Sequence, residues 1–172
     1  PTFYAESVLN SGLAVDAVGL RLQFGAASPG QTSRDLMALS NLLDRYAAME
    51  RAIHVTALGA PSGVAPVAPP AKKDEDDDEP LTLKSRDHVA GFWRVPWTDA
   101  VQATWLTDAI GIIASKPCVQ SICWQDLADA PLSPRLPEMP LGGLFSPNGA
   151  AKPAAAQFAA WRNAIRESKS LL

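Results

Sequence analysis

The sequence predicts an α/β fold in which parallel strands alternate with helices. The runs Val15 to Phe24 and Val119 to Trp124 are mostly apolar and lack the clean alternation of a strand with one face in water. Helical patterns separate the strand patterns, which favours right-handed crossovers between parallel strands. The C-terminal order of a strand, a glycine-containing loop and a helix started by Pro153 is typical of the closing unit of a (β/α) barrel.

The first elements are a helix, a strand and a second helix. Residues 3 to 12 predict the end of a helix that a glycine stops, and the strand Val15 to Phe24 follows. A cap at Thr32 or Ser33 predicts a helix through about Arg51, with Asp35 in its first turn. The apolar face of this helix contains Leu36, Leu39, Leu43 and Tyr46.

The later elements repeat this alternation. Ile53 to Leu58 predicts a strand, and Thr98 and Asp99 start a helix that must end before Pro117. The strand Val119 to Trp124 follows, and the last helix begins near Pro153, where a missing backbone donor is harmless. The apolar positions at helical spacing are Val101, Trp105, Ala109 and Ile112 in the first of these helices, and Phe158, Trp161 and Ile165 in the last.

The length of the chain limits how much of a barrel it can contain. Its 172 residues are enough for one packed domain, whereas eight β/α units typically need about 250 residues. We therefore expect a single partial barrel domain over residues 1–172, the C-terminal part of a (β/α)8 TIM barrel with about three βα units. The start at Pro1, without an initiator Met or an apolar signal segment, leads us to expect a piece of a longer protein.

Residues 60–87 interrupt the pattern and predict a long mobile loop. The segment is rich in proline and contains the acidic run Asp74 to Glu79, a composition that buries too little apolar area to offset chain entropy. A carboxylate run is also compatible with calcium binding. The alternating ligands and central glycine of an EF-hand are absent, however, so a solvated loop is the preferred interpretation.

Composition excludes several classes of function. The 15 basic and 18 acidic residues give a net charge of -3. The sequence has no stripe of basic residues interleaved with aromatic residues, which argues against nucleic-acid binding. No apolar run approaches the roughly 18 residues of a membrane span.

Cys118 and Cys123 would lie roughly 16 Å apart in one strand, beyond the about 7 Å limit for a disulfide. We expect both cysteines to be small apolar side chains in a core strand. The isolated histidines His54 and His88 predict no metal site, and we expect no cofactor.

The stretches Asp16 to Gln23, Thr56 to Gly59 and Trp124 to Asp129 resemble, in order and spacing, the last three strands of family-10 glycoside hydrolases, the xylanase family. The segments Gly143 to Phe145 and Lys152 to Ala154 also recur in that family. The resemblance covers nearly the whole chain except the acidic loop. It implies a TIM barrel of the glycosidase type, a β-glycan ligand, an N-terminal barrel half as partner, and a secreted or cell-envelope location that the sequence itself leaves unknown.

The resemblance implies a sugar-binding site with an altered catalytic position. Arg21 and Gln23 occupy the positions of the family's sugar-contacting Gln and His, and Trp124 with Asp126 matches the strand-end Trp and Asp. A salt bridge inside the barrel is the alternative for Arg21, and a plug of the barrel mouth is the alternative for Trp124. The family's nucleophilic Glu corresponds to Ala57, which has no atom that attacks an anomeric carbon. The acid/base Glu belongs to a strand outside this sequence, so we predict no catalytic residue in the chain.

Two further sets of residues allow two interpretations each. Trp93 and Trp97, which follow the predicted loop, are candidates to stack on sugar rings or to anchor the loop to the barrel wall. His54 is expected to be a hydrogen-bonded barrel histidine rather than a catalyst.

Three functions follow from these alternatives. The first is a degenerate xylanase-like barrel that binds β-glycans, and the second is a structural or interaction barrel without a carbohydrate role, since fold does not determine function. The third is a hydrolase with relocated carboxylates, for which Asp126 and Asp129 are the convenient donors. The missing Glu favours loss of the family's retaining chemistry over its relocation.

Overall fold

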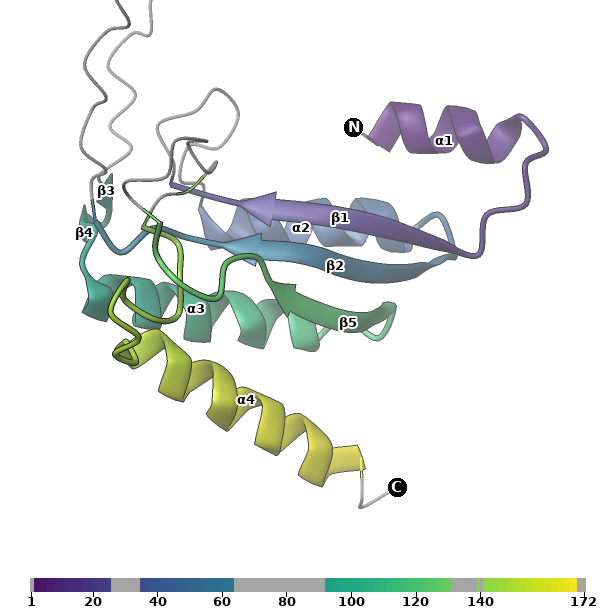
Figure 1. The fold of residues 1–172 in the computed structure, drawn as a ribbon. Coiled ribbons are helices and arrows are strands. Elements are labelled where there is room, and N and C mark those ends of the chain that lie inside the picture. The colour runs from purple at the N-terminus through teal and green to yellow at the C-terminus, as the bar shows by residue number, and fades with distance from the viewer. Residues whose placement is uncertain (1, 26–34, 64–91, 131–138, 140, 170–172) are drawn as a thin grey trace, which may run out of the picture.

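A computed structural model describes residues 2–25, 35–63, 92–130, 139 and 141–169 of the chain (Figure 1). Helices and strands alternate along these residues, as the sequence predicts. The elements are α1 (Thr2–Asn10), β1 (Ala17–Gln23), α2 (Leu36–Ala47), β2 (Ala52–Gly59), β3 (Phe92–Trp93), β4 (Val95–Pro96), α3 (Asp99–Ala114), β5 (Val119–Trp124) and α4 (Pro153–Lys169).

The central sheet contains three parallel strands in the order β1-β2-β5 (Figure 1). This is the order and direction expected when right-handed crossovers join consecutive βα units, so the predicted parallel arrangement is confirmed. Strands β3 and β4 form a separate antiparallel pair in which Phe92 lies opposite Pro96, a small unit that the sequence analysis did not predict. Because the three long strands run in one direction, their carboxyl ends meet at one edge of the sheet.

Helices α2 and α3 cover one side of the sheet, behind the strands as drawn in Figure 1. Apolar residues from paired strand positions point to this side, for example Leu22 of β1 opposite Leu58 of β2. Together they form one core with the buried faces of the helices. The largest fully buried side chains of this core are Trp105, Leu43, Ile53, Leu58, Leu106, Ile110, Ile113 and Val55.

The opposite side of the sheet, which we call the inner side, is polar. Gly19 pairs with His54, and a Cβ atom on Gly19 would lie 3.3 Å from the methyl group of Thr56. His54 in turn pairs with Ser121 of β5. None of the exposed large hydrophobic residues of the described part belongs to the three strands of this sheet, since they lie in α1, α2, β4 and connections. The inner side therefore consists of small and hydrogen-bonding side chains.

Helix α2 begins later and ends earlier than the sequence predicts. Its N-cap is Asp35, whose carboxylate accepts a hydrogen bond from the Met37 backbone N–H at 2.9 Å. The predicted caps Thr32 and Ser33 lie outside the described residues, and the helix ends at Ala47 rather than near Arg51. The predicted apolar face is confirmed: Leu39, Leu43 and Tyr46 are buried and Leu36 is partly buried. Burial also raises the pKa of the Tyr46 hydroxyl above its ordinary value.

Helix α3 begins at the predicted residue, but its buried surface is wider than the predicted apolar face. The Thr98 hydroxyl caps it by accepting a hydrogen bond from the Val101 backbone N–H at 3.2 Å. Trp105 and Ala109 are buried, whereas the predicted core residues Val101 and Ile112 are only partly buried. The buried surface is wide because α3 packs against α2, β5 and α4 at the same time. They also include Gln102, Ala103, Leu106, Ile110 and Ile113.

Two expectations about individual segments need correction. Ala60 and Pro61, placed in the mobile loop over residues 60–87, are buried at the end of β2, while residues 64–87 lie outside the described part. Cys118 and Cys123 are free, so the prediction that they form no disulfide is confirmed. Cys123 is exposed rather than part of the core. It lies in β5, an edge strand of the described sheet, and points to the side opposite Ile122, which packs on the core.

Leu43→Ala should lower the free energy of unfolding by about 2 to 5 kcal/mol, because it removes fully buried methyl groups and leaves a cavity. Met37→Ala in the same helix is the matched control, since Met37 is 64% exposed and its truncation should change stability by less than about 0.5 kcal/mol. Denaturant unfolding followed by circular dichroism measures both values. Equal effects of the two substitutions would contradict the assignment of the core to this face of α2.

Candidate functional site

The candidate site lies where the three strands end. β1 ends at Gln23, β2 at Gly59 and β5 at Trp124, so the predicted residues Gln23 and Trp124 come to the same edge of the sheet. A Cβ atom on Gly59 would lie 3.8 Å from both the Gln23 Cγ atom and the Gln125 Cβ atom. The side chains of Gln23 and Gln125 thus both lie beside Gly59 at the end of β2.

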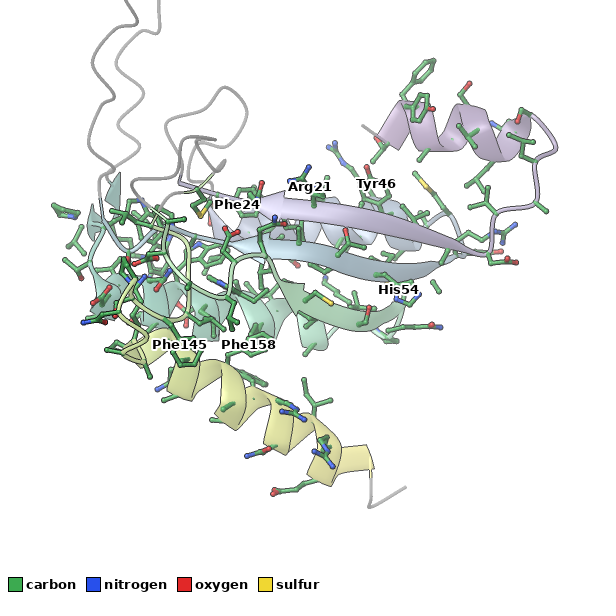
Figure 2. All side chains as sticks on the ribbon, viewed as in Figure 1. Arg21, Phe24, Tyr46, His54, Phe145 and Phe158 are labelled. Carbon is green, nitrogen blue, oxygen red and sulfur yellow. The ribbon has the colours of Figure 1, made fainter. Side chains whose placement is uncertain are left out.

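Arg21 and Gln23 lie together on β1, two residues apart on the inner side. The Arg21 Nη2 atom donates to the Gln23 Oε1 atom across 3.5 Å, a long hydrogen bond. Arg21 is exposed (Figure 2), whereas Gln23 is only 7% exposed. Of these two predicted contact residues, only Arg21 is exposed.

Ala57 lies next to Arg21. The two residues are paired across β1 and β2, and paired residues point to the same side of a sheet. Ala57 is 3% exposed. Its methyl group carries neither a nucleophilic atom nor a proton donor, so this position supplies no catalytic group. Its partner on β1, Arg21, is a cation.

Trp124 and Asp126 meet at Gly142, in the connection between β5 and α4. The Trp124 Nε1–H donates to the Gly142 carbonyl oxygen at 2.8 Å, and a Cβ atom on Gly142 would lie 3.1 Å from an Asp126 carboxylate oxygen. Trp124 pairs with Leu58, a core residue, and the indole packs partly buried against that core. The structure therefore brings these two predicted residues together at the end of β5.

A buried ion pair holds this connection in place. The Lys152 Nζ atom lies 2.8 Å from the Asp129 carboxylate, and the two side chains are 4% and 6% exposed. The same amine donates to the Gly143 carbonyl oxygen at 2.9 Å and lies 3.9 Å from Asp99 at the start of α3. Asp129 is therefore committed to a cation and is poorly placed to act as the relocated carboxylate considered from the sequence.

Gly143 allows two parts of the connection to approach each other closely. A Cβ atom at this position would lie 2.3 Å from the backbone of Ala128 and Asp129, a separation that real Cβ atoms do not adopt. Beside this contact, Phe145 forms bridges to Ala128 and Ala151. Phe145 and Phe158 of α4 both pack partly buried against the core (Figure 2).

The aromatic residues before α3 pack against each other. The Trp93 and Trp97 rings are stacked with their centroids 6.1 Å apart, and both are nearly buried. The Arg94 guanidinium lies 4.7 Å from the centroid of the Trp93 ring. Trp97 also contacts Gly25, where a Cβ atom would lie 2.6 Å from the indole. These contacts favour the anchoring interpretation of Trp93 and Trp97 over sugar stacking.

His54 is part of a polar contact between strands, away from the carboxyl edge. Its Nδ1 atom lies 2.7 Å from the Ser121 hydroxyl, near the amino ends of β2 and β5 (Figure 2). Within the described residues, no group of three or more His, Cys, Asp or Glu side chains is placed to hold a metal ion. In the same part of the chain, no helix is both long and apolar enough to cross a membrane.

Comparison with solved structures identifies the fold. Native xylanase 10B from Thermotoga maritima matches with a TM-score of 0.60 and 15% identity over 96% of this chain. A variant of xylanase 10C from Cellvibrio japonicus in complex with xylopentaose matches with a TM-score of 0.57 and 14% identity over 92% of the chain. A β-glucuronidase from Faecalibacterium prausnitzii matches with a TM-score of 0.53 and 15% identity over 87% of the chain.

The fold is that of part of a TIM barrel, as in the xylanases. The chain spans 42% of the Thermotoga xylanase, 29% of the Cellvibrio xylanase and 22% of the glucuronidase, so the rest of each of those proteins has no counterpart in it. No protein-family model matches the sequence, and no curated protein is significantly similar to it. The xylanase resemblance of the partial barrel is thus confirmed for its fold.

The partial barrel also contains site-forming residues whose roles the sequence did not reveal. Lys152 and Asp129 both lie in stretches that resemble the xylanase family, but they are separated by a long loop, and no spacing rule pairs them. The side-chain amide of Gln102 donates to the Ala60 carbonyl at 2.8 Å and thereby ties α3 to the end of β2. The segments Gly143 to Phe145 and Lys152 to Ala154, which recur in the xylanase family, pointed to this region but not to the pairing of Lys152 with Asp129.

Gly143→Ala should destabilise the partial barrel by about 1 to 3 kcal/mol, because the added Cβ atom collides with backbone rather than with a flexible side chain. Gly111→Ala is the matched control: its Cβ atom would meet Trp161 at an ordinary 3.5 Å, inside α3. There alanine should stabilise the helix by roughly 0.5 to 1 kcal/mol. Thermal and denaturant unfolding of both variants would reveal the opposite signs, and a neutral Gly143→Ala would contradict the close approach.

Proposed function

We propose that this chain is part of a glycoside-hydrolase-type barrel that binds a β-glycan at the carboxyl ends of its strands without performing retaining hydrolysis. The observation that carries this proposal is the placement of Arg21. It is exposed on the polar inner side of the sheet, at the edge where ligands bind in TIM barrels, and it is paired with Ala57. A guanidinium donates to several sugar hydroxyls at once, whereas the alanine removes the nucleophile from the same place.

The proposed ligand contacts are Arg21, Gln23, Trp124 and Asp126. Arg21 supplies exposed donors, and Gln23 supports it through the hydrogen bond to its amide oxygen. Trp124 supplies the exposed part of an indole, since an aromatic ring covers the apolar face of a pyranose. Asp126, partly buried beside Gly142, supplies an acceptor for hydroxyl groups. The solved xylanase 10C variant, which contains xylopentaose, supports a xylo-oligosaccharide as the first ligand to test.

The remaining barrel units are the proposed partner of this chain. The outer edge of β5 borders a groove of about 570 Å³ between α3 and α4. Apolar side chains from both helices line it, including Ile110, Phe158 and Trp161, and Arg162 and Arg166 lie at its rim. A further strand pairing with β5, and a helix packed beside it, would fill this groove in a complete barrel. The domain proposed over residues 1–172 would then be one part of a larger folding unit.

A structural or interaction barrel without a carbohydrate role is the second candidate. Two observations favour it: Gln23 is almost fully buried, and the indole N–H of Trp124 is already bonded to a backbone carbonyl. Both residues would then stabilise the carboxyl edge of the sheet. Direct measurement of sugar binding separates the two candidates.

Sugar binding is expected to depend on Trp124. In the protein as it occurs naturally, xylo- or cello-oligosaccharides should change the tryptophan fluorescence, and Trp124→Ala should weaken binding about 5- to 150-fold, the equivalent of about 1 to 3 kcal/mol of stacking. Tyr4→Ala is the control, because Tyr4 is an exposed aromatic residue of α1 outside the site. Absence of binding, or binding that Trp124→Ala leaves unchanged, would leave the structural barrel as the function.

Retaining hydrolysis is expected to be absent from the natural protein. Ala57 replaces the nucleophile, and a double displacement needs two carboxyl groups about 5 to 5.5 Å apart. An aryl β-xyloside should therefore be hydrolysed no faster than in buffer, with an active family-10 xylanase assayed in parallel as the positive control. Product formed with net retention would refute the proposal. Rescue by azide would instead indicate that an acid/base residue survives elsewhere in the protein.

A further inference from the structure

The Lys152 amine lies at the junction of the β5–α4 connection and two helix starts. It contacts Asp129 at 2.8 Å and the Gly143 carbonyl at 2.9 Å, and it lies directly before Pro153, the first residue of α4. Lysine and aspartate are almost never so deeply buried unless they are paired. Buried charges need nearly ideal geometry and additional hydrogen bonds to offset the loss of water. This pair is accordingly expected to tolerate little displacement.

The pair determines the orientation of one peptide group. The Gly143 backbone N–H donates to the Asp129 carboxylate at 2.8 Å. In the same peptide group, the Gly142 carbonyl oxygen accepts the hydrogen bond from Trp124 Nε1 at 2.8 Å. A peptide group is planar and its N–H and C=O point in opposite directions. Fixing the N–H on Asp129 therefore fixes the direction of the carbonyl toward the indole.

We infer that Lys152 and Asp129 are positioning residues for Trp124. Lys152 holds the Asp129 carboxylate, the carboxylate orients the 142–143 peptide group, and that group orients the indole ring at the carboxyl edge of the sheet. The consequence for ligand binding rests on the proposed function, because it matters for a sugar only if Trp124 contacts one. The orientation of the ring itself does not depend on that function.

A purely stabilising role of the ion pair makes a different prediction. Loss of the Lys152 charge leaves a buried carboxylate without its cation, so Lys152→Met should lower the unfolding temperature under either interpretation. Lys152→Met combined with Asp129→Leu removes both charges and should recover much of that stability. If the pair only stabilises the fold, the environment of Trp124 should recover as well. If the pair positions the ring, the environment of Trp124 should remain altered, because Leu accepts no hydrogen bond from Gly143.

The environment of Trp124 is measurable by fluorine NMR after incorporation of 5-fluorotryptophan into the naturally occurring protein. Trp124→Phe assigns the Trp124 resonance. We expect that resonance to shift or broaden in Lys152→Met, and to stay displaced in the Lys152→Met and Asp129→Leu double variant while the unfolding temperature recovers. The Trp161 resonance, which reports on α4 beside Gly111, should keep its position in the double variant.

Lys116→Met is the matched control. It breaks the Lys116–Asp44 pair, which has a Nζ–Oδ1 distance of 2.6 Å but a largely exposed aspartate, and it should leave the Trp124 resonance unchanged. A Trp124 resonance that returns to its wild-type position in the double variant would overturn the inference. An unchanged resonance in Lys152→Met would overturn it as well.

Oligosaccharide titration of the same variants separates this inference from the proposed function. If the double variant weakens sugar binding by the same factor as Trp124→Ala, both are supported. A displaced Trp124 resonance in a protein that binds no sugar supports the positioning role and refutes the proposed function. Unweakened sugar binding with an undisplaced resonance refutes the positioning role alone.

Discussion

The buried apolar layer between the sheet and helices α2 and α3 determines the arrangement of the other elements. Because Ile53, Val55 and Leu58 of β2 are buried in this layer, β2 lies at the centre of the sheet and β1 and β5 lie on either side. The helices occupy one side, and the strands end at one edge. The candidate ligand residues, the glycines of the β5–α4 connection and the Lys152–Asp129 pair all lie at that edge as a consequence.

Two kinds of contact organise the carboxyl edge, and they have opposite requirements. The approach of Gly143 to the Ala128 backbone needs the absence of a side chain, whereas the Lys152 amine needs several acceptors at fixed distances. Both contacts act on the connection that carries the hydrogen-bond acceptor for Trp124. The described residues of this connection are thereby tied to the end of β5 and to the start of α4.

Local periodicity was sufficient to predict the three strands of the central sheet and the starts of α3 and α4, but not the short pair β3 and β4. The helix start at Thr98 depends on a hydrogen bond to a residue three positions later, and the apolar strands pair with adjacent strands. Both features are therefore visible in short stretches of sequence. Three features depend instead on which elements pack together: the shorter α2 helix, the wide buried surface of α3 and the exposure of Cys123. The Lys152–Asp129 pair depends on the path of a loop, which no residue pattern specifies. Arg21 and Gln23 were found by resemblance, and their unequal exposure became clear only from the packed structure.

The polar inner side of the sheet has a consequence for self-association. Gly19, His54 and Ser121 at paired inner positions, together with Thr56 beside them, offer little carbon surface. Two copies stacked through this side would therefore gain little from excluding water. Among the described residues, no strand pairs with the outer edge of β5, and the apolar groove lies beside it. This edge is therefore more prone to association than the inner side. Arg162 and Arg166 also line that groove, so a contact that placed the grooves of two identical chains face to face would bring like charges together.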